Sequence, residues 1–192
     1  MATDDGVSRF DGVDFRTYGM RDGLSYPAIN SICEGSGQRL WAGTREGLCW
    51  LDLTRRGTAQ RWHRVELPGG DLANQISIVR SDSKGNLWAA APTHLFIHHR
   101  AAPVGAFDEV VLPSDEGGFP PLIINDLAAG RGGVVWISTS RGLFRHLPDG
   151  TISRVEFHGL GLGHGSETGM ITVAPDGVLW VHGLRGLLLR VG

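Results

Sequence analysis

Tryptophan recurs at nearly even intervals along this chain, as Trp41, Trp88, Trp136 and Trp180, separated by 47, 48 and 44 residues. The residues around each tryptophan repeat in the same register. An aliphatic residue stands nine positions before it (Ile32, Val79, Leu127 and Ile171) and a leucine seven positions after it (Leu48, Leu95, Leu143 and Leu187). Twelve positions before it stand Ile29, Ile76, Ile124 and, as the exception, Thr168. Repeats of this length are typical of propellers, solenoids and arrays.

Each repeat predicts four short strands separated by turn residues such as Pro175-Asp176-Gly177. The chain contains 29 glycines and shows no run of apolar residues at helical spacing. The fold class is therefore all-β, a β-propeller of four blades of about 47 residues with four strands each. The expected blades are residues 20–65, 66–112, 113–157 and 158–192, with 6–18 as an N-terminal hairpin, in a single domain spanning 1–192.

The repeat resembles the two-component regulator propeller repeat. The first copy carries the resemblance in Asp22-Gly23-Leu24, Ile29, Ile32, residues 40–44 (LWAGT) and Gly47-Leu48. The resemblance implies a bacterial signal-transduction module, the extracytoplasmic sensor region ahead of a membrane segment and a histidine kinase or diguanylate cyclase. No kinase or cyclase motif occurs in this sequence. Later copies depart from the pattern, with Ala90-Ala91 and His182-Gly183 in place of Gly-Thr.

The ends of the repeat pattern leave two architectures open. If Val13–Tyr18 paired with Leu187–Arg190, the last blade would gain its fourth strand and a four-bladed ring would close, which removes open sheet edges. Gly6–Phe10 would then duplicate a third strand that is already present. The sequence therefore favours a fragment of a larger propeller, or a self-associating array, over a closed four-bladed ring.

Charge and composition argue against some classes of partner. The formal net charge is -2 and no basic block occurs, which argues against nucleic acid. No apolar run reaches the length of a membrane span, and residues 1–10 lack the features of a signal peptide. We expect a periplasmic location for a fragment of a sensor protein and a cytoplasmic one for a complete chain. Cys33 and Cys49 lack CxxC spacing, which favours reduced thiols over a disulfide.

Recognition is expected in the loops that meet on one face of a propeller, because rigid sheets fix the positions of such loops. The candidate binding residues in these loops are Arg21, Asp22, Tyr26, Arg45, Glu46, His94, Arg141, His164, Glu167, His182 and Arg185. Asp71, Asp115 and Glu116 lie in the same loops. The turn Arg45-Glu46 and the corresponding turns Thr93-His94, Ser140-Arg141 and Leu184-Arg185 vary most between repeats.

The sequence predicts no catalytic residues, no metal site and no cofactor. His158, His164, Glu167 and His182 could together hold a divalent cation, but their spacing matches no known metal motif, and ordinary glycine-rich connections also contain such residues. His98 and His99 are predicted to be solvated at a strand end. The four repeated tryptophans are predicted to fill the core, which leaves Tyr26, Trp50 and Phe119 as exposed stacking candidates.

Three functions compete at this stage. The leading one is a non-catalytic sensory module that binds a small molecule, a glycan or a protein. The alternative is an enzyme resembling the propeller lyases that open cyclic ester antibiotics, with His164, Glu167 and His182 near a divalent metal. The third is a structural repeat scaffold that assembles into a homo-oligomer.

Overall fold

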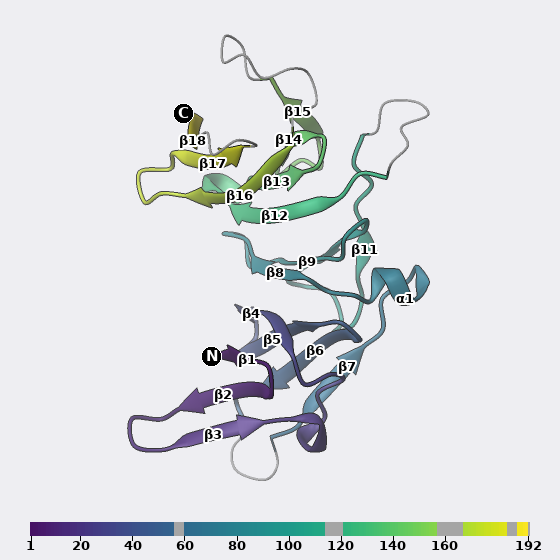
Figure 1. Cartoon of the computed structure of the whole chain (residues 1–192), viewed down its shortest axis with the longest axis vertical. Helices are drawn as coiled ribbons and strands as arrows, with labels where there is room; N and C mark the ends of the chain where they lie inside the picture. The colour runs from purple at the N-terminus through teal and green to yellow at the C-terminus, as the bar shows by residue number, and fades with distance from the viewer. Residues whose placement is uncertain (56–59, 114–120, 157–166, 184–187, 192) are drawn as a thin grey trace. The chain divides into compact units, whose positions relative to one another are not determined.

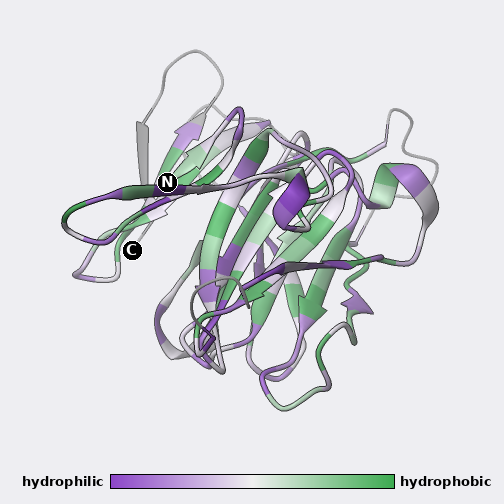
Figure 2. Ribbon diagram, turned by 90° about the horizontal axis from the view of Figure 1, so that it is seen from below, coloured by the Kyte–Doolittle hydropathy of each residue, from purple (hydrophilic) through white to green (hydrophobic). Residues whose placement is uncertain are grey.

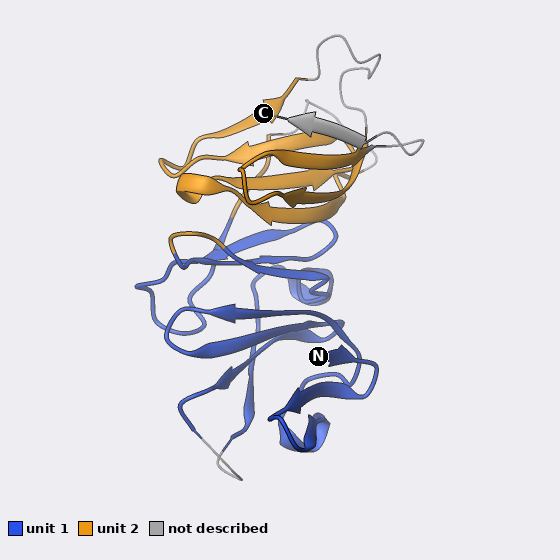
Figure 3. Ribbon diagram, turned by 90° about the vertical axis from the view of Figure 1, so that its left-hand side faces the viewer, with its two compact units in different colours: residues 1–81, 85–109 blue, residues 82–84, 110–192 orange. Residues whose placement is uncertain are grey.

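The computed structural model describes residues 1–55, 60–113, 121–156, 167–183 and 188–191. The described chain is all-β, and its antiparallel sheets carry three or four strands each (Figure 1). It divides into two compact units, residues 1–81 with 85–109 and residues 82–84 with 110–192 (Figure 3). We call them unit 1 and unit 2. The predicted β-propeller fold class is confirmed by these blade-like sheets.

Unit 1 begins with two sheets. The first has three strands, β1 (Ala2–Thr3), β2 (Gly6–Phe10) and β3 (Phe15–Tyr18). The short 3-10 helix η1 (Met20–Asp22) leads to a second sheet that contains the first tryptophan repeat. Its four strands follow chain order: β4 (Ile29–Gly35), β5 (Arg39–Thr44), β6 (Gly47–Asp52) and β7 (Trp62–Val65).

The third sheet of unit 1 follows a four-residue helix, α1 (Gly70–Ala73), which the sequence did not predict. Its strands are β8 (Ile78–Ser81), β9 (Leu87–Ala90), β10 (Leu95–His98) and β11 (Asp108–Glu109). Again each strand pairs with the next one in the chain. This up-and-down order is the one expected of a propeller blade.

Unit 2 contains two further sheets. The first consists of β12 (Ile124–Ala129), β13 (Val135–Thr139), β14 (Gly142–His146) and β15 (Ile152–Val155), with the short helix η3 (Arg131–Gly133) between its first two strands. The second consists of β16 (Thr168–Val173), β17 (Leu179–Gly183) and β18 (Leu188–Val191). Within unit 1, β3 pairs with β2, and within unit 2, β18 pairs with β17. The ring-closing pairing of Val13–Tyr18 with Leu187–Arg190 stays a prediction. The expectation of one domain over residues 1–192 stays a prediction.

The strands carry both apolar and polar residues, shown in green and purple in Figure 2, and some, such as β9, are apolar throughout. The apolar residues form the contacts between neighbouring sheets of a unit. In unit 1 one core joins Trp41 and Leu48 of the second sheet to Val79, Leu87 and Phe96 of the third. Trp41 and Trp88 are buried, while Trp136 and Trp180 are half-buried. The repeated tryptophan is thus chiefly a core residue, and burial of its large ring stabilises the packing of the sheets.

Polar side chains add a specific joint between the second and third sheets of unit 1. A β-bulge after Ile29 leaves Asn30 outside the pairing register of β4 with β5. Its side-chain Nδ2 donates a hydrogen bond of 2.9 Å to the carbonyl of Ile76, ahead of β8. The hydroxyl of Ser31 accepts a hydrogen bond of 3.0 Å from the backbone N–H of Val79 in β8. We call this pair of interactions the inter-sheet clasp.

Unit 2 has the same clasp at the corresponding positions. A bulge after Ile124 frees Asn125, whose Nδ2 donates to the carbonyl of Thr168 at 2.7 Å. The carboxylate of Asp126 accepts from the backbone N–H of Ile171 at 3.0 Å. Bulges of this kind redirect a side chain out of its own ladder. Here they direct it to the next sheet.

The exceptional Thr168 of the repeat pattern is explained by its hydrogen bonds. Its side chain is buried, and its hydroxyl accepts from Ser138 Oγ at 2.9 Å and from the backbone N–H of Thr139 at 3.2 Å. The same hydroxyl lies 3.1 Å from the carbonyl of Gly142. A buried threonine at this position is stable because its polar group is satisfied.

Three predictions of exposure were wrong. His98 is only 3% exposed, because the chain that returns after β10 covers it: its Nδ1 lies 2.8 Å from the carbonyl of Ala106 and its ring packs beside Phe107. Tyr26 and Trp50 are both half-buried, and the ring of Trp50 stacks on that of His63 with the centroids 4.6 Å apart. The free cysteines differ in burial. Cys49 is buried and Cys33 is partly buried, and neither forms a disulfide.

Candidate functional site

A polar hollow of about 530 Å³ lies on the connections of unit 1. Three segments line it: the connection before β4, the β5–β6 turn together with β7, and α1 with the chain that follows. The lining residues are Tyr26, Arg45, Glu46, Arg64, Asp71, Asn74 and Gln75. The side chains thus supply two guanidinium groups, two carboxylates, two amides and a phenol. The hollow therefore contains both hydrogen-bond donors and acceptors, and its formal charges balance.

The β5–β6 turn is fixed by the threonine of the repeat. Thr44 Oγ1 donates to the carbonyl of Gly47 at 2.9 Å and accepts from the backbone N–H of Glu46 at 3.1 Å. These bonds use only backbone groups of the turn, so the side chains of Arg45 and Glu46 stay exposed at the hollow. Ser25 extends the arrangement, since its hydroxyl lies 2.9 Å from Thr44 Oγ1.

A glycine opposite β7 allows Arg64 to reach the hollow. Gly47 has a φ of +124°, and a Cβ there would lie 3.1 Å from Nε of Arg64. The absent side chain therefore leaves room for the guanidinium to cross the turn. The cross-strand pairing of Arg64 with Cys49 fixes the position of Arg64 along β7 relative to the β5–β6 turn.

The third side of the hollow is a loop held by Asn74. The side-chain Oδ1 of Asn74 accepts from the N–H of Leu67 at 2.9 Å, and Nδ2 donates to the carbonyls of Leu67 and Gly70 at 3.0 and 2.9 Å. Asn74 is buried and its amide is committed to these bonds. It therefore holds the loop in place, whereas the exposed Asp71 and half-buried Gln75 are the groups free to meet a ligand.

Three of the predicted binding residues come together here, namely Tyr26, Arg45 and Glu46. Three others of unit 1 lie elsewhere. Asp22 accepts a hydrogen bond from the N–H of Gly19 at 2.9 Å, which caps η1, and Arg21 is exposed on the same helix. His94 is half-buried with its ring stacked near Phe96, and its Nε2 would lie 3.3 Å from a Cβ at Gly69.

Sequence reasoning missed Arg64 and Gln75. Arg64 lies in a predicted fourth strand, where an exposed arginine has no distinguishing context. The available signal was its register opposite Cys49, two residues after the Gly47 that begins the third strand. Gln75 directly precedes the repeated Ile76 and so sits at the edge of the loop that was predicted.

The predicted residues of unit 2 do not form a comparable site in the part of the chain that the structure describes. Glu167 and His182 are exposed, and Arg141 lies in a turn whose N–H donates to Thr139 Oγ1 at 3.1 Å. His158, His164, Arg185, Asp115, Glu116 and Phe119 lie outside the described residues. Among the residues that are described, no group of three histidine, cysteine or acidic side chains is placed to hold a metal ion.

No model of a known protein family matches the sequence, and no curated protein matches it either. Solved structures do share its fold. The extracellular domain of the one component system BT4673 from B. thetaiotaomicron has a TM-score of 0.72 and 21% identity, over 100% of this chain and 24% of that one. The extracellular domain of the hybrid two component system BT3049 from the same organism has a TM-score of 0.69 and 16% identity, over 96% and 23%.

An enzyme structure is similar as well. Virginiamycin B lyase from Staphylococcus aureus has a TM-score of 0.67 and 14% identity, over 98% of this chain and 63% of the lyase. The chain thus spans about a quarter of the length of the extracellular domains and less than two thirds of the lyase. These similarities establish the propeller fold. None of the helices among the described residues is long and apolar enough to cross a membrane.

Proposed function

We propose that this chain is a non-catalytic, ligand-binding part of a sensory propeller and that the polar hollow of unit 1 binds a small polar molecule. The observation that carries the proposal is the convergence of Tyr26, Arg45 and Glu46, from separate connections, with Arg64 and Asp71 around one hollow. The fold shared with two extracellular domains of one- and two-component systems supports the sensory part and an extracytoplasmic location.

The chemistry of the lining favours a neutral, polyhydroxylated ligand such as a short glycan. Arginine donates, carboxylate accepts, and the amide of Gln75 does both, which suits the hydroxyl groups of a sugar. The opposite charges of two arginines and two acidic residues do not select a strongly charged ligand. The ring of Tyr26 adds an apolar face with a polar edge, as sugar sites commonly need.

The experiment is a thermal-shift screen of the purified chain against neutral oligosaccharides, uronic acids and free amino acids, followed by calorimetric titration of any compound that stabilises it. A ligand at 100 times its Kd stabilises the folded protein by about 2.7 kcal/mol, which shifts the Tm by several degrees. We expect Arg45→Ala and Glu46→Ala each to weaken binding about tenfold.

Arg141→Ala provides the matched control, because Arg141 occupies the corresponding turn of unit 2 and is not among the residues that line the hollow. It should leave binding unchanged. The proposal is wrong if no compound in the three classes binds, or if Arg141→Ala weakens binding as much as the two variants of the hollow do.

The alternative function is a lyase, favoured by the fold shared with virginiamycin B lyase. In this alternative His164, Glu167 and His182 would act with a divalent metal. A titration with Mg²⁺, followed by calorimetry on the wild type and on His182→Ala, distinguishes the two functions. Under our proposal, the calorimetric traces of the wild type and of His182→Ala with Mg²⁺ should be identical. Saturable Mg²⁺ binding that His182→Ala abolishes would favour the lyase.

A further inference from the structure

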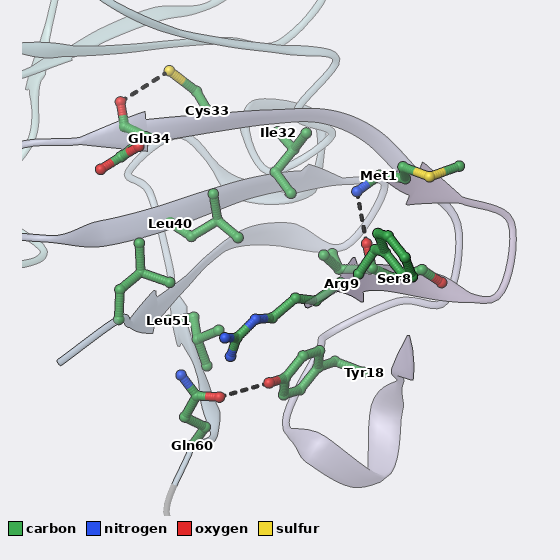
Figure 4. A pocket seen from close by; sticks show the side chains of 13 residues that line it. Met1, Ser8, Arg9, Tyr18, Ile32, Cys33, Glu34, Leu40, Leu51 and Gln60 are labelled. Carbon is green, nitrogen blue, oxygen red and sulfur yellow. Dashed lines mark hydrogen bonds between the residues drawn. The ribbon is translucent and has the colours of Figure 1, made fainter. Parts of the chain in front are cut away.

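A second hollow of unit 1 differs in chemistry from the polar one. It has a volume of about 500 Å³ and lies between the sheet of β1–β3 and the sheet of β4–β7 (Figure 4). Val7 and Tyr18 line it from the first sheet, and Ile32, Leu40 and Leu51 line it from the second. Its volume lies within the range of about 300–1,000 Å³ that small-molecule sites occupy.

The lining of this cavity is mainly aliphatic. Leu53 continues the row of Ile32, Leu40 and Leu51 along the second sheet. Ile32, Leu40 and Leu53 are only partly buried against the core between these sheets, so a chain of methylene groups laid along them would remove apolar surface from water. Cys33, the next residue on β4, belongs to the opposite face, where it packs against the core shared with β8. Burial there raises the pKa of its thiol.

One end of the cavity contains a buried amide. Gln60 is only 3% exposed, and its Oε1 accepts a hydrogen bond of 2.6 Å from the hydroxyl of Tyr18. This bond leaves the amide Nε2 as a donor. No described residue accepts a hydrogen bond from it. Gln60 as a residue is buried and lines the cavity, so a ligand acceptor that meets its Nε2 would gain a hydrogen bond there.

Arg9 supplies a second donor at the same end. Its side chain extends from β2 across the cavity, with the guanidinium directed toward Leu51, as Figure 4 shows. Among the residues that the structure describes, Arg9 forms neither an ion pair nor a side-chain hydrogen bond. Two donors, one of them cationic, therefore lie beside an aliphatic surface.

We propose that this cavity binds an aliphatic carboxylic acid, with the carboxylate at Arg9 and Gln60 and the alkyl chain along Ile32, Leu40 and Leu53. A carboxylate accepts from both donors, and the bond to the guanidinium is charge-assisted. The alkyl chain fills the aliphatic remainder of the cavity. The site is separate from the polar hollow, so either proposal can fail without the other.

Glu34 provides a test of whether the head group of the ligand is negatively or positively charged. It lines the cavity from β4, as a neighbour of Leu40 on β5, and would repel an anion while attracting a cation. An acid and an alkylammonium therefore respond in opposite directions to the loss of Glu34. Glu34→Gln should leave the binding of an acid equal or tighter, whereas Arg9→Gln should weaken it about tenfold.

The experiment is a calorimetric titration of the full chain with decanoate, held below its micelle concentration, with decanol and decyltrimethylammonium as probes that keep the chain and change the head group. Nitrogen-15 NMR of the same samples locates the ligand. We expect one decanoate per chain, and chemical-shift changes concentrated at residues 7–10, 32, 40, 51–53 and 60. Decanol should bind about tenfold more weakly, and Arg9→Gln should remove that difference.

Arg45→Gln serves as the control, because it changes an exposed arginine of the polar hollow without touching this cavity. Far-UV circular dichroism establishes that each variant is folded. The proposal is overturned if decanoate produces no localised shifts, if Arg45→Gln weakens binding as much as Arg9→Gln, or if decyltrimethylammonium binds more tightly than decanoate and Glu34→Gln weakens it.

Discussion

The two units join their neighbouring sheets at the same two positions but with different groups. In both, an asparagine on a bulge donates to the next sheet, from Asn30 in unit 1 and from Asn125 in unit 2. The following residue accepts a backbone N–H from that sheet, through the hydroxyl of Ser31 or the carboxylate of Asp126. Both units thus use an asparagine amide at the first position of the clasp. At the second position, either a hydroxyl or a carboxylate oxygen can accept the backbone N–H.

The intervening repeat shows what happens without the clasp residues. Ser77 and Ile78 stand at the corresponding positions before and in β8, and the Ser77 hydroxyl donates to the carbonyl of Ala90 within its own sheet. Gly169 and Met170 stand there in the last repeat. The repeats therefore alternate, with clasp residues in the first and third only. The tryptophan thus occurs in all four repeats, whereas the clasp residues occur in every second repeat.

The largest expected effect is the loss of the charged half of the clasp. Asp126→Ala removes the acceptor for two backbone N–H groups, those of Leu127 at 2.8 Å and Ile171 at 3.0 Å, and should lower the stability of unit 2 by about 1.5–3 kcal/mol. Ser31→Ala should lower that of unit 1 by about 1 kcal/mol, because the hydroxyl is neutral. Native-state hydrogen exchange at the amides of Ile171 and Val79 measures the two losses.

Asp126→Ser adds the matched control, because it installs the group used in unit 1. It should recover part of the protection at Ile171. Equal losses from Asp126→Ala and Ser31→Ala would show that the two joints do not differ in strength.

The asparagine half of the clasp should be alike in both units. Asn30→Ala and Asn125→Ala each leave one backbone carbonyl without its side-chain donor, and each should cost about 1 kcal/mol in urea unfolding. Ser77→Ala should cost less, because the carbonyl of Ala90 keeps its 2.9 Å bond from the Ser77 backbone N–H. A clearly larger loss from Ser77→Ala than from either asparagine variant would contradict this comparison.

The smallest effect concerns pH and two turn carboxylates, the half-buried Asp52 of unit 1 and the exposed Asp149 of unit 2. A hydrogen bond from the hydroxyl of Thr54 is the main cause that lowers the pKa of Asp52 below its usual 3.8, and one from the backbone N–H of Thr151 does so for Asp149. Because the folded state favours the charged form, the contribution is complete above the unfolded pKa and is lost as pH falls through the folded one.

Carboxyl NMR titration tests the two carboxylates separately. Thr54→Val should raise the pKa of Asp52 toward 3.8 and leave that of Asp149 unchanged, because the pKa of Asp149 is lowered chiefly by hydrogen bonds from Thr151 and not by Thr54. An unchanged Asp52 pKa in this variant would exclude the hydroxyl as the principal cause.

The fold could be predicted because its signals are local and repeated. The spacing of Trp41, Trp88 and their aliphatic neighbours follows from strand alternation, which each repeat specifies for itself. Tyr26, Arg45 and Glu46 could be named as candidates because turns are where a propeller exposes variable side chains. The burial of His98 could not be predicted, because the covering chain at Ala106 and Phe107 returns from outside the strand pattern.

The two hollows show the same limit. Arg64 joins the polar hollow only because Gly47 leaves space opposite it, and Gln60 faces the aliphatic cavity only because Tyr18, 42 positions away, holds its oxygen. Each depends on a pair of residues whose relation appears once two strands are placed. No single-sequence pattern contains that information.

The threonine-held turn has a consequence for altering this protein. Thr44 and Thr139 bind the same backbone groups of their turns, although the residues they enclose differ, Arg45-Glu46 in one and Ser140-Arg141 in the other. The conformation is thus independent of the side chains that the turn displays. Such turns could exchange their two central residues between repeats as interchangeable cassettes, so that new recognition surfaces could be assembled on an unchanged framework.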